Sequence, residues 1–196
     1  MARTKSRPRP VISRKQRRTS AWRWTAFIAA PAILAILVAV SALSERDTTG
    51  PDQAAPFELT TSDGQTVSLD EALAGGDALL YFSMGVGCDG CFAQIPEIED
   101  SVAERGLTLL PIMVDPAPQV AAEAARFGIE RPILIDPGAR ISSAYGMVGI
   151  YGHGDRPSHS FALVRQSGEI AWVRHYAEMF VPAAVLLGEL DAAGGT

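Results

Sequence analysis

An uncharged run of 20 residues, Trp24 to Leu43, restricts what this 196-residue chain can fold into. At 1.5 Å rise per residue, a helix of this length matches the hydrocarbon core of a bilayer, which is about 30 Å thick. Nine basic residues and no acid lie between Arg3 and Arg23, and a helix buried in a globular core would not bring such a leader with it. The sequence therefore predicts a basic cytoplasmic leader at 1–23 and a transmembrane helix at 24–43.

Charge on the two sides of this run predicts its orientation. Basic residues stay on the cytoplasmic side, whereas Ser44 to Asp52 holds two Asp, one Glu and only one Arg. We therefore expect a single-pass protein of the cell membrane, with its N-terminus in the cytoplasm and the rest of the chain outside it. A signal peptide cleaved near Val40-Ser41-Ala42 is the alternative, although the run exceeds the usual 7 to 15 residues of a signal's apolar region. Arg17-Arg18 is better explained as topology charge than as a twin-arginine signal, because the residues that follow are not strongly apolar.

A polar segment at 44–56, rich in Pro, Gly, Thr and Asp, predicts a flexible linker that leads to one folded domain at 57–196. Residues 1–46 carry ten of the 17 Lys and Arg and one of the 22 acids, a net charge of +9. The other 150 residues carry seven Arg, no Lys and 21 acids, a net charge of −14. Such an acidic domain repels phosphate backbones, so nucleic acid is excluded as its partner.

The domain alternates apolar runs typical of buried strands with amphipathic segments typical of helices. A hairpin is expected over 57–69, because Asp63-Gly64 is a strong turn signal between alternating residues. Further strands are expected at 78–84, 107–114, 133–135, 161–164 and 170–174, and helices at 91–105, 119–127, 139–145 and 181–192. This order predicts an α/β fold with a central mixed β-sheet flanked by helices.

The only two cysteines, Cys88 and Cys91, lie between a predicted buried strand and a predicted helix. Unpaired backbone N–H groups and the helix dipole stabilise a thiolate at a helix N-terminus, so the pKa of Cys88 is expected to be lowered. A thiolate attacks disulfides, and a second cysteine three positions further along the chain can resolve the mixed disulfide. The flanking Gly85, Gly87 and Gly90 would leave room for the disulfide of a partner.

Other roles for the pair fit less well. A structural disulfide would close so short a loop that it removes little chain entropy. A metal site would need two more ligands from His153, His159 and His175, whose spacing matches no known pattern. Haem attachment requires His directly after the second cysteine, and that residue is Phe92.

With these features in order, the chain resembles the thioredoxin superfamily, in the redoxin branch that contains membrane-anchored thiol-disulfide oxidoreductases of the TlpA type. This branch is related to the alkyl hydroperoxide reductase and thiol-specific antioxidant family. The resemblance covers Phe57 to about Leu190. It rests on the hairpin, the strand before Cys88-x-x-Cys91, and a set of later matches: Pro96, Asp115, Phe127-Gly128, Pro132 to Pro137, Tyr145-Gly146, Phe161 to Val164 and Gly168 to Ile170.

The resemblance implies a thioredoxin-like fold and protein thiol-disulfide exchange, with Cys88 as nucleophile, Cys91 as resolving cysteine and no cofactor. It implies protein disulfides or dithiols as substrates and an electron donor in the membrane or periplasm. A bacterial source is suggested by the topology and the Arg- and Ala-rich composition. The direction of electron flow follows from the reduction potential and stays open at this point.

Four neighbours of the dithiol are expected. Asp89 and Gly90 replace the family's Gly-Pro, and the charge of Asp89 should raise the pKa of the thiols unless water screens it. Pro157 is the one candidate for the family's cis-proline, although it lies one residue further from Phe161 than usual. His159 would then face the dithiol as a proton acceptor, or serve only as a spacer.

Two other functions remain as alternatives. A peroxiredoxin-like thiol peroxidase, with antioxidant activity, would have Thr or Ser three residues before Cys88 and Pro seven before it, where this chain has Gly85 and Tyr81. A copper-binding assembly protein of the redoxin type usually has three residues between its cysteines and an added His ligand. Asp115 and Asp136, at predicted strand ends, are expected to cap the helices that follow and to take no part in the chemistry.

Overall fold

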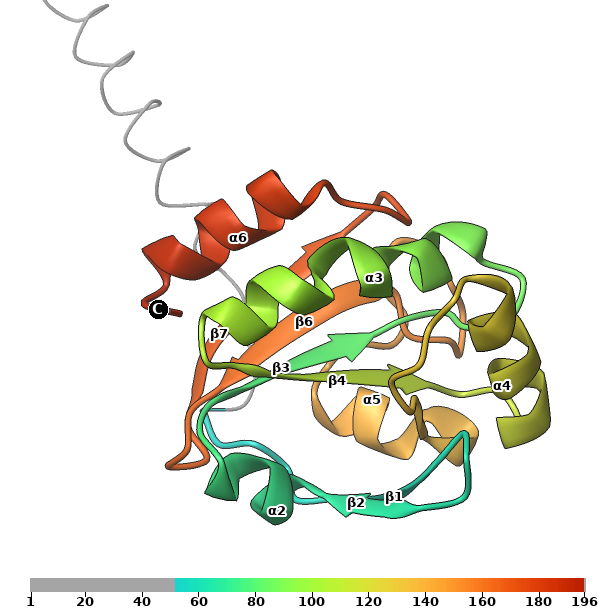
Figure 1. The fold of residues 1–196 in the computed structure, drawn as a ribbon, viewed down its shortest axis with the longest axis horizontal. Helices are drawn as coiled ribbons and strands as arrows, with labels where there is room; N and C mark the ends of the chain where they lie inside the picture. The colour runs from blue at the N-terminus through green and yellow to red at the C-terminus, as the bar shows by residue number, and fades with distance from the viewer. Residues whose placement is uncertain (1–51, 196) are drawn as a thin grey trace, which may run out of the picture. The chain divides into compact units, whose positions relative to one another are not determined.

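The computed structural model describes residues 52–195 (Figure 1). The predicted leader 1–23, the predicted membrane helix 24–43 and most of the predicted linker 44–56 lie outside this range. Within 52–195, no helix is long and apolar enough to cross a bilayer.

A seven-stranded sheet forms the centre of the domain, in the order β2-β1-β5-β4-β3-β6-β7. Strands β3, β4 and β5 are mutually parallel, while β6 runs antiparallel to β3, β7 to β6, β1 to β5 and β2 to β1. The predicted mixed α/β sheet is therefore confirmed. The strand bounds are β1 Glu58–Thr61, β2 Thr66–Ser68, β3 Ala78–Phe82, β4 Thr108–Met113, β5 Leu134–Ile135, β6 His159–Val164 and β7 Ile170–Tyr176.

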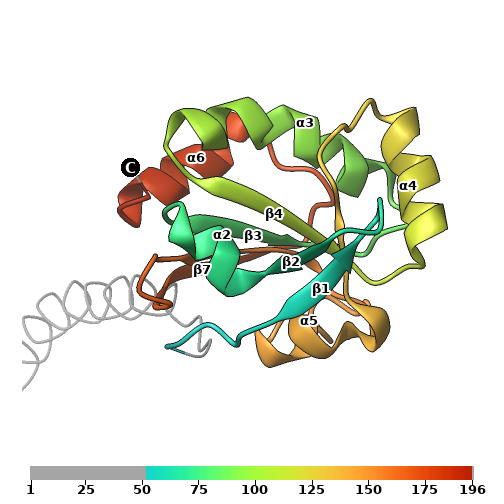
Figure 2. The ribbon, with the colours of Figure 1, turned by 60° about the horizontal axis from the view of Figure 1, so that its bottom comes forward.

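Helices cover both faces of this sheet (Figure 2). Among the described residues they are α2 Leu69–Ala74, α3 Asp89–Glu104, α4 Ala117–Arg126, α5 Arg140–Ala144 and α6 Ala183–Ala192, with a 3-10 turn at Pro137–Ala139. The alternation of side chains along β3 separates two cores. Leu79 and Tyr81 face the core shared with α3, α4 and α6, whereas Leu80 and Phe82 face the core shared with α2 and Tyr145.

Helix α3 forms because its apolar residues fall on one face. Phe92, Ile95, Ile98 and Val102 recur every three or four residues, and all are buried against the sheet. Strand β3 is buried along its whole length, as its continuous apolar run predicts for a central strand. These two elements place the segment between them, which contains Cys88, at the carboxyl end of β3.

Most predicted elements are found, with shifts at their ends. The hairpin turns at Asp63-Gly64 as predicted, with Gly64 at φ +86°. Helix α2 was not predicted, although its Ser68 and Glu71 form a capping box. Strand β6 begins at His159, two residues earlier than predicted, and β7 continues to Tyr176.

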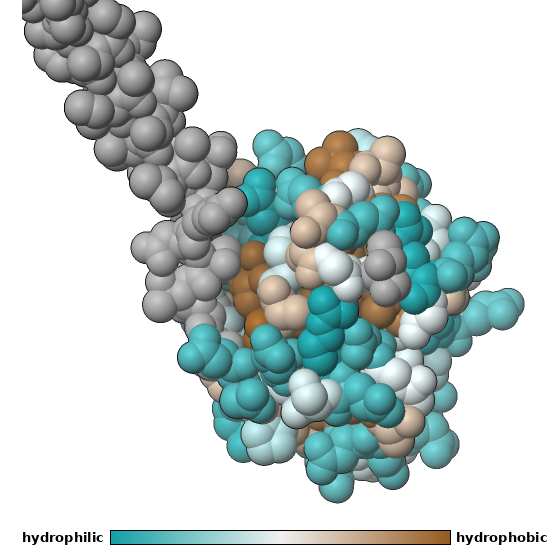
Figure 3. Space-filling view, turned by 90° about the vertical axis from the view of Figure 1, so that its left-hand side faces the viewer, coloured by the Kyte–Doolittle hydropathy of each residue, from teal (hydrophilic) through white to brown (hydrophobic). Residues whose placement is uncertain are grey.

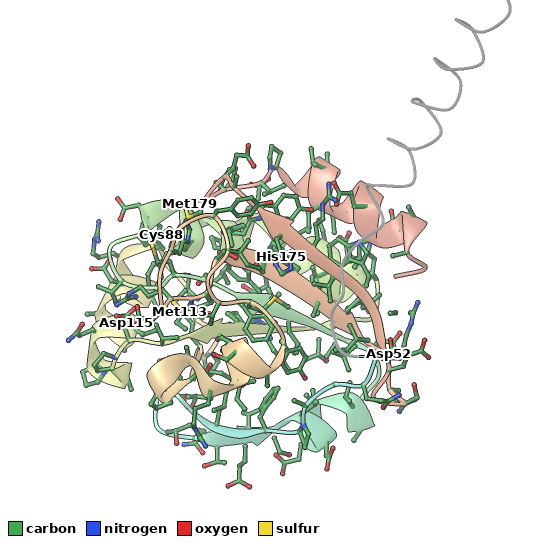
Figure 4. All side chains as sticks on the ribbon, turned by 180° about the vertical axis from the view of Figure 1, so that it is seen from behind. Asp52, Cys88, Met113, Asp115, His175 and Met179 are labelled. Carbon is green, nitrogen blue, oxygen red and sulfur yellow. A yellow bond between two sulfur atoms is a disulfide. The ribbon has the colours of Figure 1, made fainter. Side chains whose placement is uncertain are left out.

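The first described residues attach at the end of the sheet away from Cys88. The Asp52 carbonyl accepts from Ile170 N at 3.1 Å, and Ala54 N donates to the Gly168 carbonyl at 2.9 Å. Gly168 lies in the β6–β7 turn, beside the start of β3 rather than its end. Figure 4 shows Asp52 and Cys88 on opposite sides of the domain. The surface at the Asp52 end is largely hydrophilic, with apolar side chains in separate patches (Figure 3).

Candidate active site

Cys88 and Cys91 are joined by a disulfide at the beginning of α3, with Cα atoms 5.3 Å apart. Cys88 is the N-cap residue of the helix, and Cys91 lies in its first turn. Cys88 is 5% exposed, whereas Cys91 is fully buried. Cys88 is therefore the more exposed of the two cysteines.

The helix N-terminus faces the sulfur of Cys88. The backbone N–H of Cys91 donates to Cys88 Sγ at 3.2 Å, which is within the range of a hydrogen bond to sulfur. In the reduced protein the same N–H, together with the dipole of the 16-residue helix, would stabilise a thiolate on Cys88. The predicted position of Cys88 at a helix N-terminus is confirmed.

Asp89 and Gly90, between the two cysteines, face different surroundings. The Asp89 side chain is 75% exposed and lies 3.9 Å from the guanidinium of Arg126. Water and Arg126 both weaken the effect of the Asp89 charge on the sulfurs. Gly90 packs against the loop between β7 and α6, where a Cβ atom would come within 2.7 Å of the Met179 carbonyl oxygen. Figure 4 shows Met179 next to Cys88.

The cis-proline interpretation of Pro157 is wrong, because no peptide bond within 52–195 is cis. Pro157 is buried and pairs with Val148 in an isolated β-bridge, two residues before β6. Main-chain pairing holds this segment before the strand begins, since Ser158 N donates to the Met147 carbonyl oxygen at 3.0 Å.

His159 lies under α3, buried at the first position of β6. Its Nδ1 is 3.0 Å from the Tyr81 hydroxyl, and its Nε2 is 3.1 Å from Gln94 Oε1. Both ring nitrogens are within hydrogen-bond distance of these two side chains, so the ring is linked to α3 only through Tyr81 and Gln94. The direct contact with the sulfurs that we expected is not among its hydrogen bonds.

Gln94 determines the protonation of this ring. Its amide N donates to the Val181 carbonyl at 3.0 Å, and its Oε1 accepts from Val181 N at 2.7 Å. Since Oε1 is an acceptor, the His159 nitrogen that faces it carries the proton. Burial lowers the pKa of His159 to about 4, which leaves the ring neutral at pH 7, with Nδ1 as an acceptor.

Tyr81 connects His159 to the dithiol. Its hydroxyl oxygen lies 3.0 Å from the carbonyl oxygen of Cys91 and 3.0 Å from His159 Nδ1. Burial raises the pKa of Tyr81 well above its usual value, so the hydroxyl keeps its proton. The Tyr81 hydroxyl has one proton, so at any moment it donates either to His159 Nδ1 or to the carbonyl oxygen of Cys91.

Asp115 and Asp136 lie at strand ends, as predicted, but only Asp136 caps a helix. Its carboxylate accepts from the backbone N–H groups of Ile141 and Ser142 in the first turn of α5. Helix α4 follows Asp115 but has Pro116 as its N-cap and no side-chain cap. The capping role predicted for Asp115 is therefore wrong.

Asp115 instead contacts the loop that leads to Cys88. It accepts from Val86 N at 2.7 Å and forms a two-pronged ion pair with Arg156, at 2.6 and 3.0 Å. Burial raises the pKa of Asp115, but the bonds from Arg156 and Val86 outweigh burial and hold the pKa below its usual value. Neither the Arg156 contact nor the Gln94 and Tyr81 network was predicted; the only sequence signal was a polar Gln94 on the apolar face of a helix.

Within 52–195, no group of three or more His, Cys, Asp and Glu side chains converges as metal ligands. His175, one of the three histidines considered, has its Nδ1 bonded to Ser160 Oγ at 2.8 Å instead.

Fold and cysteine pair together define a thioredoxin-like redox protein. The AhpC/TSA family model matches residues 51–173, and the chain belongs to this family. The thiol-disulfide oxidoreductase ResA of Halalkalibacterium halodurans is 29% identical over 126 residues, which cover 62% of this chain and 66% of that protein.

Two solved structures of Mycobacterium tuberculosis proteins share the fold. The peroxidoxin BcpB has a TM-score of 0.61 at 22% identity, over 73% of this chain and 96% of that one. A secreted disulfide oxidoreductase homologous to E. coli DsbE has a TM-score of 0.55 at 18% identity, over 69% of this chain and 95% of that one. The predicted redoxin resemblance and thioredoxin-like fold are confirmed.

Proposed function

We propose that this protein is a membrane-tethered, extracytoplasmic protein thiol-disulfide oxidoreductase. The observation that carries the proposal is the pair itself: a disulfide at a helix N-terminus, with one slightly exposed and one buried cysteine. The similarity to ResA supports the same chemistry.

Reduction of a partner proceeds in two exchanges. The Cys88 thiolate attacks one sulfur of the partner's disulfide, the S–S bond breaks, and the other partner sulfur leaves as a thiolate that takes a proton from water. Cys91 then loses its proton and attacks Cys88 Sγ, which forms the Cys88–Cys91 disulfide and releases the second partner sulfur as a thiol. A dithiol donor in the membrane or periplasm restores the reduced pair. Run backwards, the same steps oxidise a partner dithiol.

The direction of flow is tested by the reduction potential of the pair, measured by redox titration with thiol labelling. A value near −270 mV or lower indicates a reductant, and a value near −120 mV indicates a disulfide donor. A pair that never cycles contradicts the proposal.

Cysteine variants test the roles of the two sulfurs. Cys88→Ser should abolish reduction of insulin disulfides, because it removes the attacking thiolate. Cys91→Ser should instead accumulate a mixed disulfide between Cys88 and the substrate, detectable by mass spectrometry, because the resolving step is lost. Wild-type activity in Cys88→Ser would overturn the mechanism.

The location is proposed from the N-terminal charge pattern, and the attachment of Asp52 opposite Cys88 suits it. A chain held at its N-terminal segment would present the dithiol on its far side, toward extracytoplasmic partners. Alkaline phosphatase fused after Thr196 and expressed in a bacterium should be active, since this reporter folds only after export. An inactive fusion on a stably expressed chain argues for a cytoplasmic domain.

A thiol peroxidase is the second candidate, because the peroxidoxin BcpB shares the fold. Peroxide consumption that saturates at low peroxide concentration and requires Cys88 would favour it. Disulfide reduction without such consumption would favour the oxidoreductase.

A further inference from the structure

The loop between β3 and the dithiol, residues 83–87, is held by two charged side chains from distant parts of the chain. Asp115 follows β4, and Arg156 lies in the segment that precedes β6. The Asp115 carboxylate accepts from Val86 N at 2.7 Å, and the Arg156 guanidinium donates to the Met84 carbonyl oxygen. The two side chains thus bind the loop on both sides of Gly85.

Gly85 lets the carboxylate approach this closely. A Cβ atom at position 85 would lie 2.2 Å from Asp115 Oδ2, and the backbone there has φ +85°, which L side chains rarely adopt. The carbonyl of Gly85 in turn accepts from the Cys88 N–H at 3.1 Å. A continuous chain of contacts therefore runs from the Asp115–Arg156 pair through Gly85 to the backbone of Cys88.

The Asp115–Arg156 ion pair has a defined geometry, unlike an ion pair between two solvent-exposed side chains. The Asp115 side chain is only 7% exposed, and it binds Arg156 through both oxygens. A two-pronged bond fixes the planes of both groups, and removing Arg156 would leave the nearly buried Asp115 carboxylate without its ion-pair partner.

We propose that Asp115 and Arg156 are positioning residues that hold the 83–87 loop so that Cys88 Sγ faces the N-terminus of α3. The inference rests on the proposed thiol-disulfide function. When the loop loosens, Cys88 turns away from the helix amides, and its thiolate loses stabilisation. The pKa of Cys88 then rises, and the pair becomes more reducing because its reduced form is less stable.

Two single variants separate positioning from simple charge effects. Asp115→Asn removes a negative charge near the loop, and Arg156→Gln removes a positive one. If the two groups acted on Cys88 only through their charge, the two variants would move the pKa of Cys88 in opposite directions. Positioning predicts that both raise it.

The measurement uses the full-length chain with Cys91→Ala, which leaves Cys88 as its only thiol. The rate of alkylation by iodoacetamide as a function of pH reports the thiolate fraction. Below the pKa of Cys88, both variants should react about tenfold more slowly, which corresponds to a rise of about one pH unit in pKa. Arg156→Lys keeps the positive charge but cannot form both guanidinium hydrogen bonds to Asp115, so its alkylation rate should lie between those of the parent and Arg156→Gln.

Arg105 and Asp191 provide a matched control. They form an equally two-pronged pair, at 2.8 and 3.0 Å, that joins the other end of α3 to α6. Arg105→Gln and Asp191→Asn repeat the two charge changes and should leave the alkylation profile unchanged. Opposite shifts in the two loop variants, or profiles like those of the controls, would overturn the inference.

Outcomes for this inference and for the proposed function can be told apart. If the loop variants shift the alkylation profile while the wild-type protein exchanges with no disulfide, the positioning role is supported and the proposed oxidoreductase function is contradicted. If Asp115→Asn fails to fold, as judged by circular dichroism, Arg156→Lys and Arg156→Gln still test the graded loss. Equal rates in these two variants and the parent then count against positioning.

Discussion

His159 offers a sharp test of the buried network, because its environment makes folding sensitive to mild acid. Burial lowers the pKa of its ring from 6.5 to about 4. Between pH 6.5 and pH 4, His159 binds a proton in the unfolded chain but not in the folded protein, so the free energy of unfolding decreases as the pH falls. Stability from this source is fully present above pH 6.5 and fully lost below pH 4.

The size of the effect follows from the two pKa values. Their separation corresponds to about 3 kcal/mol of unfolding free energy, of which about 2 kcal/mol is lost between pH 7 and pH 5. Replacing His159 with Gln removes the titration and keeps the polar contacts, since an amide can donate to Gln94 Oε1 and accept from Tyr81. Between pH 7 and pH 5, the unfolding free energy of His159→Gln should therefore decrease by about 2 kcal/mol less than that of wild type.

Urea unfolding of both oxidised proteins at pH 7, 6 and 5 measures the difference. Carboxylates with lowered pKa values, such as Asp77 and Asp115, destabilise the fold only as the pH falls below their usual 3.8, outside this window. Burial and the charge of Arg174 also lower the pKa of His175, so His175→Gln is the matched control and should keep most of the wild-type loss. Parallel pH profiles for wild type and His159→Gln would refute the assignment of a neutral, buried His159.

Two further substitutions test the packing around the site and the helix that was missed. Gly90→Ala would place a Cβ 2.7 Å from the Met179 carbonyl oxygen and should lower the free energy of unfolding, measured in urea, by about 1–3 kcal/mol. The control Gly188→Ala has open space around the new Cβ and should be neutral or stabilising. Equal effects of the two variants would contradict the contact at Gly90. Ser68→Ala removes the α2 capping box and should cost about 1 kcal/mol by the same measurement, and an unchanged midpoint would show that the cap contributes nothing.

Local patterns predicted most of the fold. Strand β3 and helix α3 follow from a continuous apolar run and a regular apolar stripe, and their junction placed Cys88 at a helix N-terminus. Helix α2 has only six residues, too short for periodicity to show, although its capping pattern was visible in the sequence. The start of β6 was misplaced because a polar His159 was not expected on a buried strand.

Contacts between distant segments were not predictable in the same way. Asp115 and Arg156 are 41 residues apart, and nothing in either local sequence indicates the other. Asp115 was interpreted as a helix cap because acids at strand ends often have this role, but Pro116 takes the cap position and leaves its carboxylate free to bind the 83–87 loop. The surroundings of the two cysteines therefore depend on topology, whereas the cysteines themselves were found from spacing alone.

The same loop bears on which chemistry this member of the AhpC/TSA family performs. Where the resemblance leads one to expect a Thr or Ser hydroxyl in a peroxidase, Gly85 has no side chain, and Asp115 Oδ2 occupies the adjacent space. Hydrogen bonds from Arg156 and Val86 keep that carboxylate ionised, so it accepts hydrogen bonds and has no proton to donate to a peroxide oxygen. Disulfide exchange requires no such donor, since a stabilised thiolate and a resolving thiol suffice. The Asp115 and Arg156 contacts at this loop therefore support our proposal of disulfides rather than peroxides as substrates.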